Sequence, residues 1–286
     1  MPKSLFILRR MAMALVVVAA ANLCASETAL MDPPTKGLVA YYPFNGNAED
    51  ASGGGNHALV TGAMLTDDKF GNTSSALSFN GIGDHMMAPI CISPSVMPSI
   101  TIVVWARADQ KDRMVTLVSN DVERLNGRAL SMRPSPGKGV CWATSTNTGG
   151  SWVWQQVEVG KWTFLALSYD QESKKIRFYV DGNKYERDCS QIDGSIDLSI
   201  GKHPRGGQYF QGVLDELRVY DRILNDKEIA ALYHQFQNGN QVDRDMASMP
   251  NDGRRGLLLV FITGFCLFAG IVLVANIMIR KRSFPA

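Results

Sequence analysis

The chain has 286 residues, of which 45% are hydrophobic and 20% charged, and a formal net charge of +2. Eight of its 29 basic residues lie beside apolar runs at the two ends, whereas all 27 acidic residues lie between Glu27 and Asp252. The middle of the chain therefore carries a net charge of about −6, which excludes nucleic-acid binding and attraction to anionic lipid.

The N-terminal segment has the pattern of a secretory signal peptide. Basic residues at positions 3, 9 and 10 precede an uncharged apolar run, Met11–Leu23, and small residues follow at Ala25 and Ser26. Thirteen apolar residues are too few to span a bilayer, so we expect cleavage after residues 1–25. An uncleaved anchor is the alternative.

Residues 36–236 are long enough for one large β domain. Short apolar strands alternate with turns rich in Gly, Asn and Asp, and Asp181-Gly182 is a strong hairpin signal. The predicted strands are Leu38–Tyr42, Ala76–Phe79, Ile100–Arg107, Met114–Ser119, Ala129–Arg133, Val140–Thr144, Trp152–Val157, Thr163–Tyr169, Ile176–Val180, Asp197–Ile200 and Val213–Tyr220.

One helix is predicted in this domain, over Asp226–Phe236, because Asn225 and Glu228 have the spacing of a capping box. Many strands without alternating helices indicate antiparallel sheets, and hence an all-β sandwich or jelly roll. Residues 237–255 are polar and rich in turn formers, which is typical of a flexible stalk.

Gly256–Ile279 is an uncharged run of 24 residues, long enough as a helix to cross a bilayer. It predicts a single transmembrane helix followed by a short tail, residues 280–286. Because a signal peptide precedes it, we expect a single-pass protein with its N-terminal domain extracellular or luminal and its C-terminus cytoplasmic.

Six segments of the β domain resemble the concanavalin A-like, laminin-G-type domain family. In chain order they are residues 37–50 (GLVAYYPFNGNAED), 52–57 (SGGGNH), 70–79 (FGNTSSALSF), 162–170 (WTFLALSYD), 176–182 (IRFYVDG) and 210–222 (FQGVLDELRVYDR). The resemblance implies a concanavalin A-like antiparallel β-sandwich. It does not fix the function, because one sandwich fold carries many functions.

The resemblance also implies a structural calcium site that joins the first loop to the last strand. Asp50, Asn56 and Asp215 match its positions, and oxygen ligands are what calcium requires. The alternative is that the Asn- and Gly-rich segments are turn formers and that Asp215 is an ordinary strand residue. The turn after Phe79 reads NGIGD and lacks the paired acids that the family often has there.

Two groups of residues are candidates for ligand binding. Trp152 and Trp154 are two apart on a predicted strand, so both rings project from one face and would form a platform for sugar rings. His203, Arg205 and Tyr209 lie in a polar loop that would hydrogen-bond a ligand. The alternatives are a face covered by the opposite sheet and an ordinary solvated loop. Trp105 and Trp162 are expected to serve packing.

No catalytic constellation is present in the sequence. Glycosidases of this fold carry Glu-x-Asp-x-x-Glu on one strand, and that string does not occur here. Asp215 and Glu216 are adjacent, so regular strand geometry would point them to opposite faces. The four histidines lack metal-ligand spacing.

Two further features concern an oxidising compartment. Cys91, Cys141 and Cys189 are an odd number of cysteines in the β domain, and the sequence does not decide whether two of them form a disulfide. Asn72-Thr73-Ser74 is an N-glycosylation sequon, which matters only in a eukaryotic host.

We therefore expect a membrane-anchored binding module whose partner is a glycan or a glycosylated extracellular protein. A structural or adhesive protein-binding domain is the first alternative, and a luminal cargo receptor related to L-type lectins is the second. A glycosidase is the least favoured.

Overall fold

The computed structural model describes residues 33–122, 127–145, 151–189 and 193–235; of Ser145 and residues 151–154 it describes the backbone alone. The predicted signal peptide, stalk, membrane span and tail lie outside these residues. Within the described ranges, no helix combines the length and the apolar character needed to cross a membrane.

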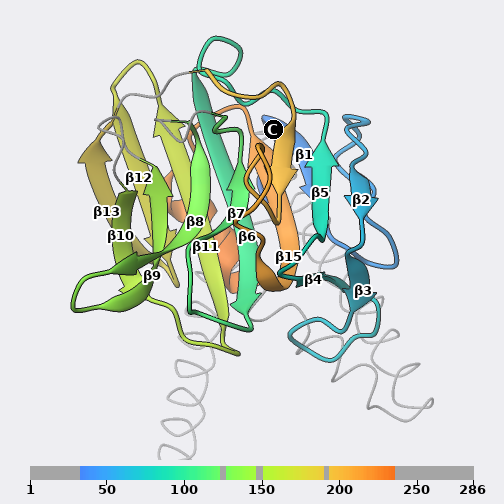
Figure 1. The fold of residues 1–286 in the computed structure, drawn as a ribbon. Coiled ribbons are helices and arrows are strands. Elements are labelled where there is room, and N and C mark those ends of the chain that lie inside the picture. The colour runs from blue at the N-terminus through green and yellow to red at the C-terminus, as the bar shows by residue number, and fades with distance from the viewer. Residues whose placement is uncertain (1–32, 123–126, 146–150, 190–192, 236–286) are drawn as a thin grey trace, which may run out of the picture. The chain divides into compact units, whose positions relative to one another are not determined.

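Two antiparallel sheets lie face to face in this part of the chain (Figure 1), as predicted for an all-β sandwich. Sheet A has the order β13-β12-β11-β6-β15-β4-β3, with β1 also paired to β15. Its strands are β1 (Leu38–Tyr42), β3 (Met64–Thr66), β4 (Ala76–Asn80), β6 (Ser99–Ala108), β11 (Trp162–Asp170), β12 (Lys175–Val180), β13 (Asn183–Asp188) and β15 (Gln211–Tyr220).

Sheet B has the order β10-β9-β8-β7-β14-β5-β2. Its strands are β2 (Leu59–Thr61), β5 (His85–Ala88), β7 (Val115–Ser119), β8 (Ala129–Ser135), β9 (Gly139–Ser145), β10 (Ser151–Gln156) and β14 (Leu198–Ile200).

The core lies between the two sheets and follows the two-residue alternation of each strand. In β6, Ile102 and Val104 enter the core while their neighbours Val103 and Trp105 lie on the outer face of sheet A. Sheet B contributes Trp142, one of the largest fully buried side chains, from β9. Burial of this apolar surface is the main source of stability.

All the predicted strands are present, with ends that differ by at most two residues. Four strands were missed: β2, β3, β5 and β13. The first two have only three residues, and β13 has the sequence NKYERD, in which charged side chains hide the strand pattern. The predicted hairpin turn joins β12 to β13, where Asp181 and Gly182 both have positive φ (47° and 82°) as a type I′ turn requires.

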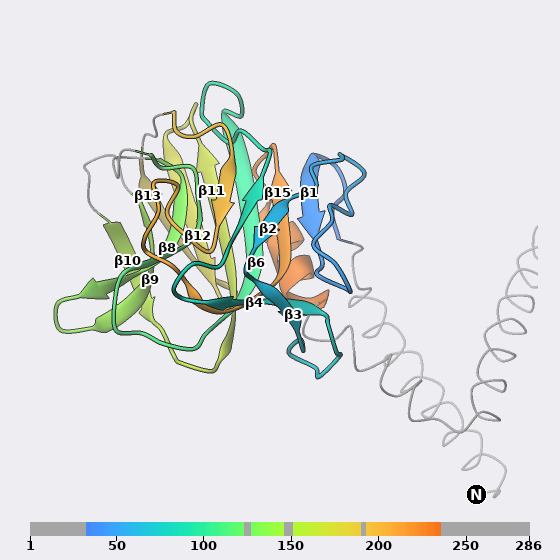
Figure 2. The same ribbon diagram turned by 45° about the vertical axis from the view of Figure 1, so that its right-hand side comes forward.

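The predicted helix spans residues 226–235 of the described chain, and its capping box is confirmed. Asn225 Oδ1 accepts hydrogen bonds from the Lys227 and Glu228 N–H groups, and the Glu228 carboxylate accepts one from the Asn225 N–H at 2.9 Å. Figure 2 shows this helix, in orange, next to β15.

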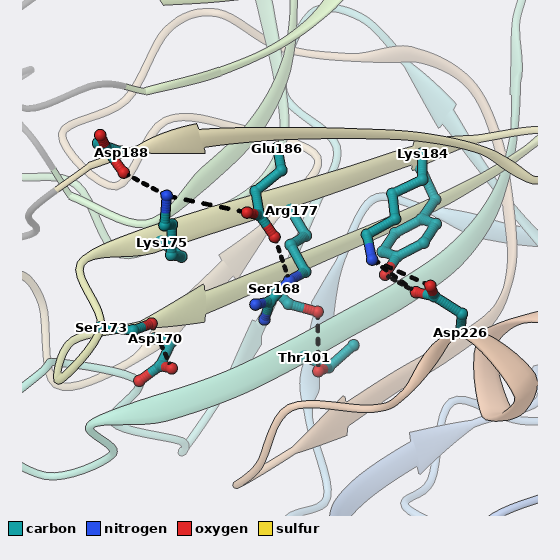
Figure 3. Close-up of polar contacts among 11 residues, drawn as sticks. Thr101, Ser168, Asp170, Ser173, Lys175, Arg177, Lys184, Glu186, Asp188 and Asp226 are labelled. Carbon is teal, nitrogen blue, oxygen red and sulfur yellow. Dashed lines mark hydrogen bonds and ion pairs between the residues drawn. The ribbon is translucent and has the colours of Figure 1, made fainter.

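Ion pairs on the outer face of sheet A link edge strand β13 to β12 (Figure 3). Arg177 contacts Glu186 at 2.7 Å, and Lys175 contacts Asp188 at 2.6 Å. Charged side chains of this kind keep an exposed edge from pairing with another chain.

Candidate functional site

The outer face of sheet A is covered by the helix at residues 226–235 and by the segment that leads into it. The Tyr233 ring stacks on Trp105, with ring centres 5.9 Å apart, and meets Phe164 edge-on at 5.4 Å. Asp226 accepts hydrogen bonds from Tyr179 and Lys184, both on this face. The centre of this face is therefore closed to a ligand.

The predicted packing role of the two tryptophans is confirmed for Trp105 only. Trp105 is 1% exposed, but it lies beneath Tyr233 and not between the sheets. Trp162 is half-buried, and the Arg107 guanidinium lies 5.7 Å from its ring centre.

A β-bulge interrupts β15 at Asp215 and Glu216. Residues before it pair with β4 and residues after it pair with β1, so the bulge lies where two partner strands meet. Leu214 and Leu217 both enter the core, which leaves Asp215 and Glu216 outside it. The expectation that the two acids point to opposite faces is therefore wrong, because a bulge breaks the alternation.

The two acids of the bulge have different environments. Asp215 is 2% exposed, and burial, reinforced by the Glu216 charge, raises its pKa to about 9. Glu216 accepts a hydrogen bond from the Tyr41 hydroxyl at 2.9 Å and pairs with Arg218 at 2.6 Å. The Arg218 guanidinium in turn lies 4.0 Å from the Tyr41 ring centre. Glu216 is thus held by two partners in a closed cluster.

The other two predicted calcium ligands belong to the loop after β1. Asp50 accepts hydrogen bonds from main-chain N–H groups, and the Asn56 amide donates to the Val39 carbonyl at 2.8 Å. No hydrogen bond in the described ranges joins Asp215 to either residue, and no group of three or more His, Cys, Asp or Glu side chains in those ranges is placed to hold a metal. Calcium binding at these positions stays a prediction.

The outer face of sheet B has a different composition. Cross-strand neighbours here are short: Ser199 faces Ser119, and Thr116 faces Ser131, which faces Ala143. All five are buried although none belongs to the core between the sheets. Loops therefore overlie this face, and hydroxyl groups form its floor.

The loop between β14 and β15 is one of these covers. The Thr116 hydroxyl donates to the Gln208 side-chain carbonyl at 2.9 Å, and the Thr116 N–H donates to the Gln208 main-chain carbonyl at 2.9 Å. The Ser199 hydroxyl donates to the Lys202 carbonyl at 2.9 Å. Two floor residues of sheet B thus anchor the loop.

The anchored loop contains the predicted residues His203, Arg205 and Tyr209. Within it His203 N–H donates to the Gly207 carbonyl at 3.1 Å, and the turn passes through Gly206 and Gly207 at φ of 85° and 74°, where a side chain would be strained. Arg205 is exposed and Tyr209 is half-buried. His203 is buried, and its Nδ1 accepts a hydrogen bond from the Arg205 N–H at 3.2 Å. It therefore stabilises the turn and does not lie on the exposed rim.

Trp152 and Trp154 lie on β10, at the edge of the same sheet. Trp152 pairs with Thr144 of β9, and the register shifts between Val153 and Gln156. Their side chains lie outside what the structure describes, so the predicted platform stays a prediction. With β8 and β9 between them, β10 and β7 are about 14 Å apart at a strand spacing of about 4.8 Å.

A buried arginine at one end of the sandwich was not anticipated from the sequence. Arg128 is fully buried, and its guanidinium donates to the carbonyls of Ile92, Met97 and Pro98 at 2.7, 2.5 and 3.0 Å. Burial lowers its pKa to about 10, so it remains charged at neutral pH. It fixes the loop before β6 to the start of β8, and only tertiary context distinguishes it from the other basic residues.

The remaining candidates are placed as follows. In the part of the chain that the structure describes, no disulfide joins Cys91, Cys141 and Cys189, and the last two are buried. Asn72 is exposed in the loop between β3 and β4, where its side-chain amide donates to Asp68 at 2.7 Å. Glycosylation of Asn72 stays a prediction.

A family model described as the concanavalin A-like lectin/glucanases superfamily matches residues 83–230, just over half of the chain. A comparison with curated proteins found no match.

Solved structures share the fold at low sequence identity. Domain 4 of an extracellular arabinanase from Geobacillus stearothermophilus, in complex with arabinotriose, is 20% identical, with a TM-score of 0.52 over 68% of this chain and 98% of that one. A Trypanosoma rangeli sialidase in complex with sialic acid is 19% identical, with a TM-score of 0.55 over 72% of this chain and 34% of that one.

The binding domain of botulinum neurotoxin serotype D is 13% identical, with a TM-score of 0.54 over 70% of this chain. The chain spans about half the length of that toxin domain, 52%. At these identities the likeness establishes the fold alone.

Proposed function

Because the chain belongs to the concanavalin A-like lectin/glucanases superfamily, we propose that its β-sandwich is a binding module for glycans or glycosylated proteins. The observation that carries the proposal is the turn His203–Gly207. It is anchored to the floor of sheet B and stiffened by its own hydrogen bonds, and it presents the exposed Arg205. A preformed loop loses little conformational entropy when it binds.

The chemistry of this loop suits a sugar. Arg205 supplies several N–H donors in a fixed plane, which match hydroxyl or carboxylate oxygens. Tyr209 supplies a ring and a hydroxyl in a half-buried setting, a combination common in binding sites. We propose that β10, with Trp152 and Trp154, lines the far side of the same surface.

The related structures support this class of ligand without defining it. Two of them were determined with arabinotriose or sialic acid, and a third is a toxin binding domain. We propose that the chain has no catalytic activity, since Glu216 is held by Tyr41 and Arg218 and its neighbour Asp215 is buried.

We further propose that the module is displayed on a membrane, outside the cytoplasm. The support is the sequence: an N-terminal signal peptide and the apolar run Gly256–Ile279. The binding surface would then face partners outside the cell or in a lumen.

Adhesion through protein contacts alone is the second candidate. Ile82 is 79% exposed at the tip of the turn between β4 and β5. That turn is stiff, because Asn80 Oδ1 accepts the N–H groups of Ile82, Gly83 and Asp84. An apolar side chain on a rigid turn is suited to a protein pocket.

The test is a glycan array probed with the full-length chain and with Arg205→Ala and Tyr209→Ala variants. We expect at least one glycan class to bind, and each variant to reduce that binding about tenfold or more. Arg187→Ala, on edge strand β13, is the matched control and should bind like the wild type. Binding that both loop variants retain would place the site elsewhere, and an array without any binding would favour the protein-adhesion candidate.

A further inference from the structure

We infer that Asp50 closes the loop over residues 50–57 and caps the free edge of β1 through main-chain hydrogen bonds, without a metal ion. The inference concerns the calcium site that the family resemblance implies, and it does not depend on the proposed ligand.

Asp50 lies at one edge of β1. Among the described residues this strand pairs with β15 on one side only, so its other edge carries no strand there. At that edge Tyr41 N–H donates to Asp50 Oδ1 at 2.9 Å, and Ala51 N–H donates to the Tyr41 carbonyl at 2.7 Å. The loop therefore occupies the edge as one residue of an added strand would.

The Asp50 carboxylate accepts two further hydrogen bonds from the loop. Asp50 Oδ1 also accepts the Ser52 N–H at 2.8 Å, and Oδ2 accepts the Asn56 N–H at 2.9 Å. A carboxylate offers about four lone-pair positions, and three are used here. The three donors are the N–H groups of Tyr41, Ser52 and Asn56, so β1 and the loop themselves supply the partners of the carboxylate.

Two main-chain carbonyl oxygens, of Asn56 in the loop and Val39 in β1, already accept hydrogen bonds. The Asn56 carbonyl accepts the Tyr42 hydroxyl at 2.5 Å. The Val39 carbonyl accepts both the Asn56 amide at 2.8 Å and the Ser52 hydroxyl at 3.1 Å. Calcium needs six to eight oxygen ligands, and these two carbonyl oxygens are already engaged within the loop.

Asp215 lies on the other side of β1 from Asp50. Tyr41 and Tyr42 pair with Arg218 and Leu217 of β15, so Asp215 lies across β1 from the Asp50 edge. One strand spacing on each side of β1 separates the two edges by about 10 Å. An ion that bound both carboxylates would need Asp50 turned towards β15, whereas both Asp50 oxygens accept main-chain N–H groups at the free edge and in the loop. Asp50, Asn56 and Asp215 therefore do not fit one ion.

The test is hydrogen exchange of the full-length chain in chelator and in millimolar calcium, read on peptides that cover residues 50–57, with thermal melting in parallel. We expect wild-type protection and melting temperature to be the same in both media. Asp50→Asn should lose about tenfold protection in both, because its amide group cannot accept all three N–H bonds. Asp215→Asn should leave protection of this loop unchanged.

Calcium-dependent protection of the wild-type loop that disappears in Asp50→Asn or in Asp215→Asn would overturn the inference. Full protection of Asp50→Asn in chelator would overturn it as well. If Asp50→Asn does not fold, the wild-type comparison decides alone, because it needs no variant. None of these readouts depends on glycan binding, so failure of the proposed function would be distinguishable.

Discussion

The outer faces of the two sheets are both covered, but by different means. Sheet A is covered by a helix whose Tyr233 ring stacks on Trp105, so its cover is held by large apolar contacts. Sheet B is covered by a loop that hydroxyl groups of Thr116 and Ser199 hold through hydrogen bonds. The first kind of cover adds stability, whereas the second holds a polar loop in place at small energetic cost. This difference is why we assign binding to sheet B.

Trp105→Ala tests the cover of sheet A and has the largest expected effect on stability. Trp105 is 1% exposed beneath the helix, so its removal should lower the free energy of unfolding by about 3–5 kcal/mol in urea titration. The control is Trp162→Ala on the same face, where the ring is only half-buried and the loss should be clearly smaller. Equal losses would show that the helix cover contributes nothing to Trp105.

Tyr233→Ala tests the cover itself. Two aromatic contacts and part of the ring's apolar burial are lost, so we expect a cost of about 1–3 kcal/mol without any change in glycan binding. Tyr233→Phe keeps the ring and should unfold like the wild type. A binding defect in Tyr233→Ala would contradict the assignment of binding to sheet B.

A double-mutant cycle of Gln208→Ala and Thr116→Val tests the cover of sheet B. Each change removes one side of the same hydrogen bond, so we expect a coupling free energy of about 0.5–1.5 kcal/mol. The same variants should weaken glycan binding, because the loop that carries Arg205 is loosened. Additive effects on unfolding would mean that the side-chain bond does not anchor the loop.

The smallest effect concerns pH and the helix contact at Asp226. A hydrogen bond from Lys184, and a second from Tyr179, hold the pKa of this exposed carboxyl below its ordinary value. The stabilisation is therefore present above about pH 4 and is lost as the pH falls through the folded-state pKa.

We expect wild type to lose more stability than Asp226→Asn as the pH falls below 4. The difference in the free energy of unfolding should be less than about 1 kcal/mol, the size of an exposed ion pair. Melting of both proteins between pH 3 and 7 measures it. A difference between the two proteins at pH 3 as large as the difference at pH 7 would contradict this account.

The sequence predicted the parts of the fold that depend on local patterns. Strand alternation located the long strands, and the Asn225–Glu228 spacing located the helix start. Strand β13 was missed because its outward charges serve the edge rather than the core. The bulge at Asp215 was missed because it depends on two partner strands meeting on one side of β15.

The site was less predictable than the fold. Arg205 and Tyr209 are accessible as expected, but burial of His203 follows from the path of the loop over sheet B, which the loop's own sequence does not specify. Arg128 gave no local signal, since its three carbonyl partners lie some 30 residues earlier in the chain. Long-range contacts decided both.

The pairing of the first and last strands determines how the domain would respond to mechanical force. The chain enters β1 and leaves β15 at the same end, where Asp221 N–H donates to the Gly37 carbonyl at 2.9 Å and Arg222 Nε–H donates to the Lys36 carbonyl at 2.7 Å. A pull on both segments would load the bonds between the two strands one after another, as in a zipper, rather than all together in shear. The helix at residues 226–235 follows β15, so its Tyr233–Trp105 contact would bear the load first, and the bonds at the strand ends, from Arg222 onward, would bear it next.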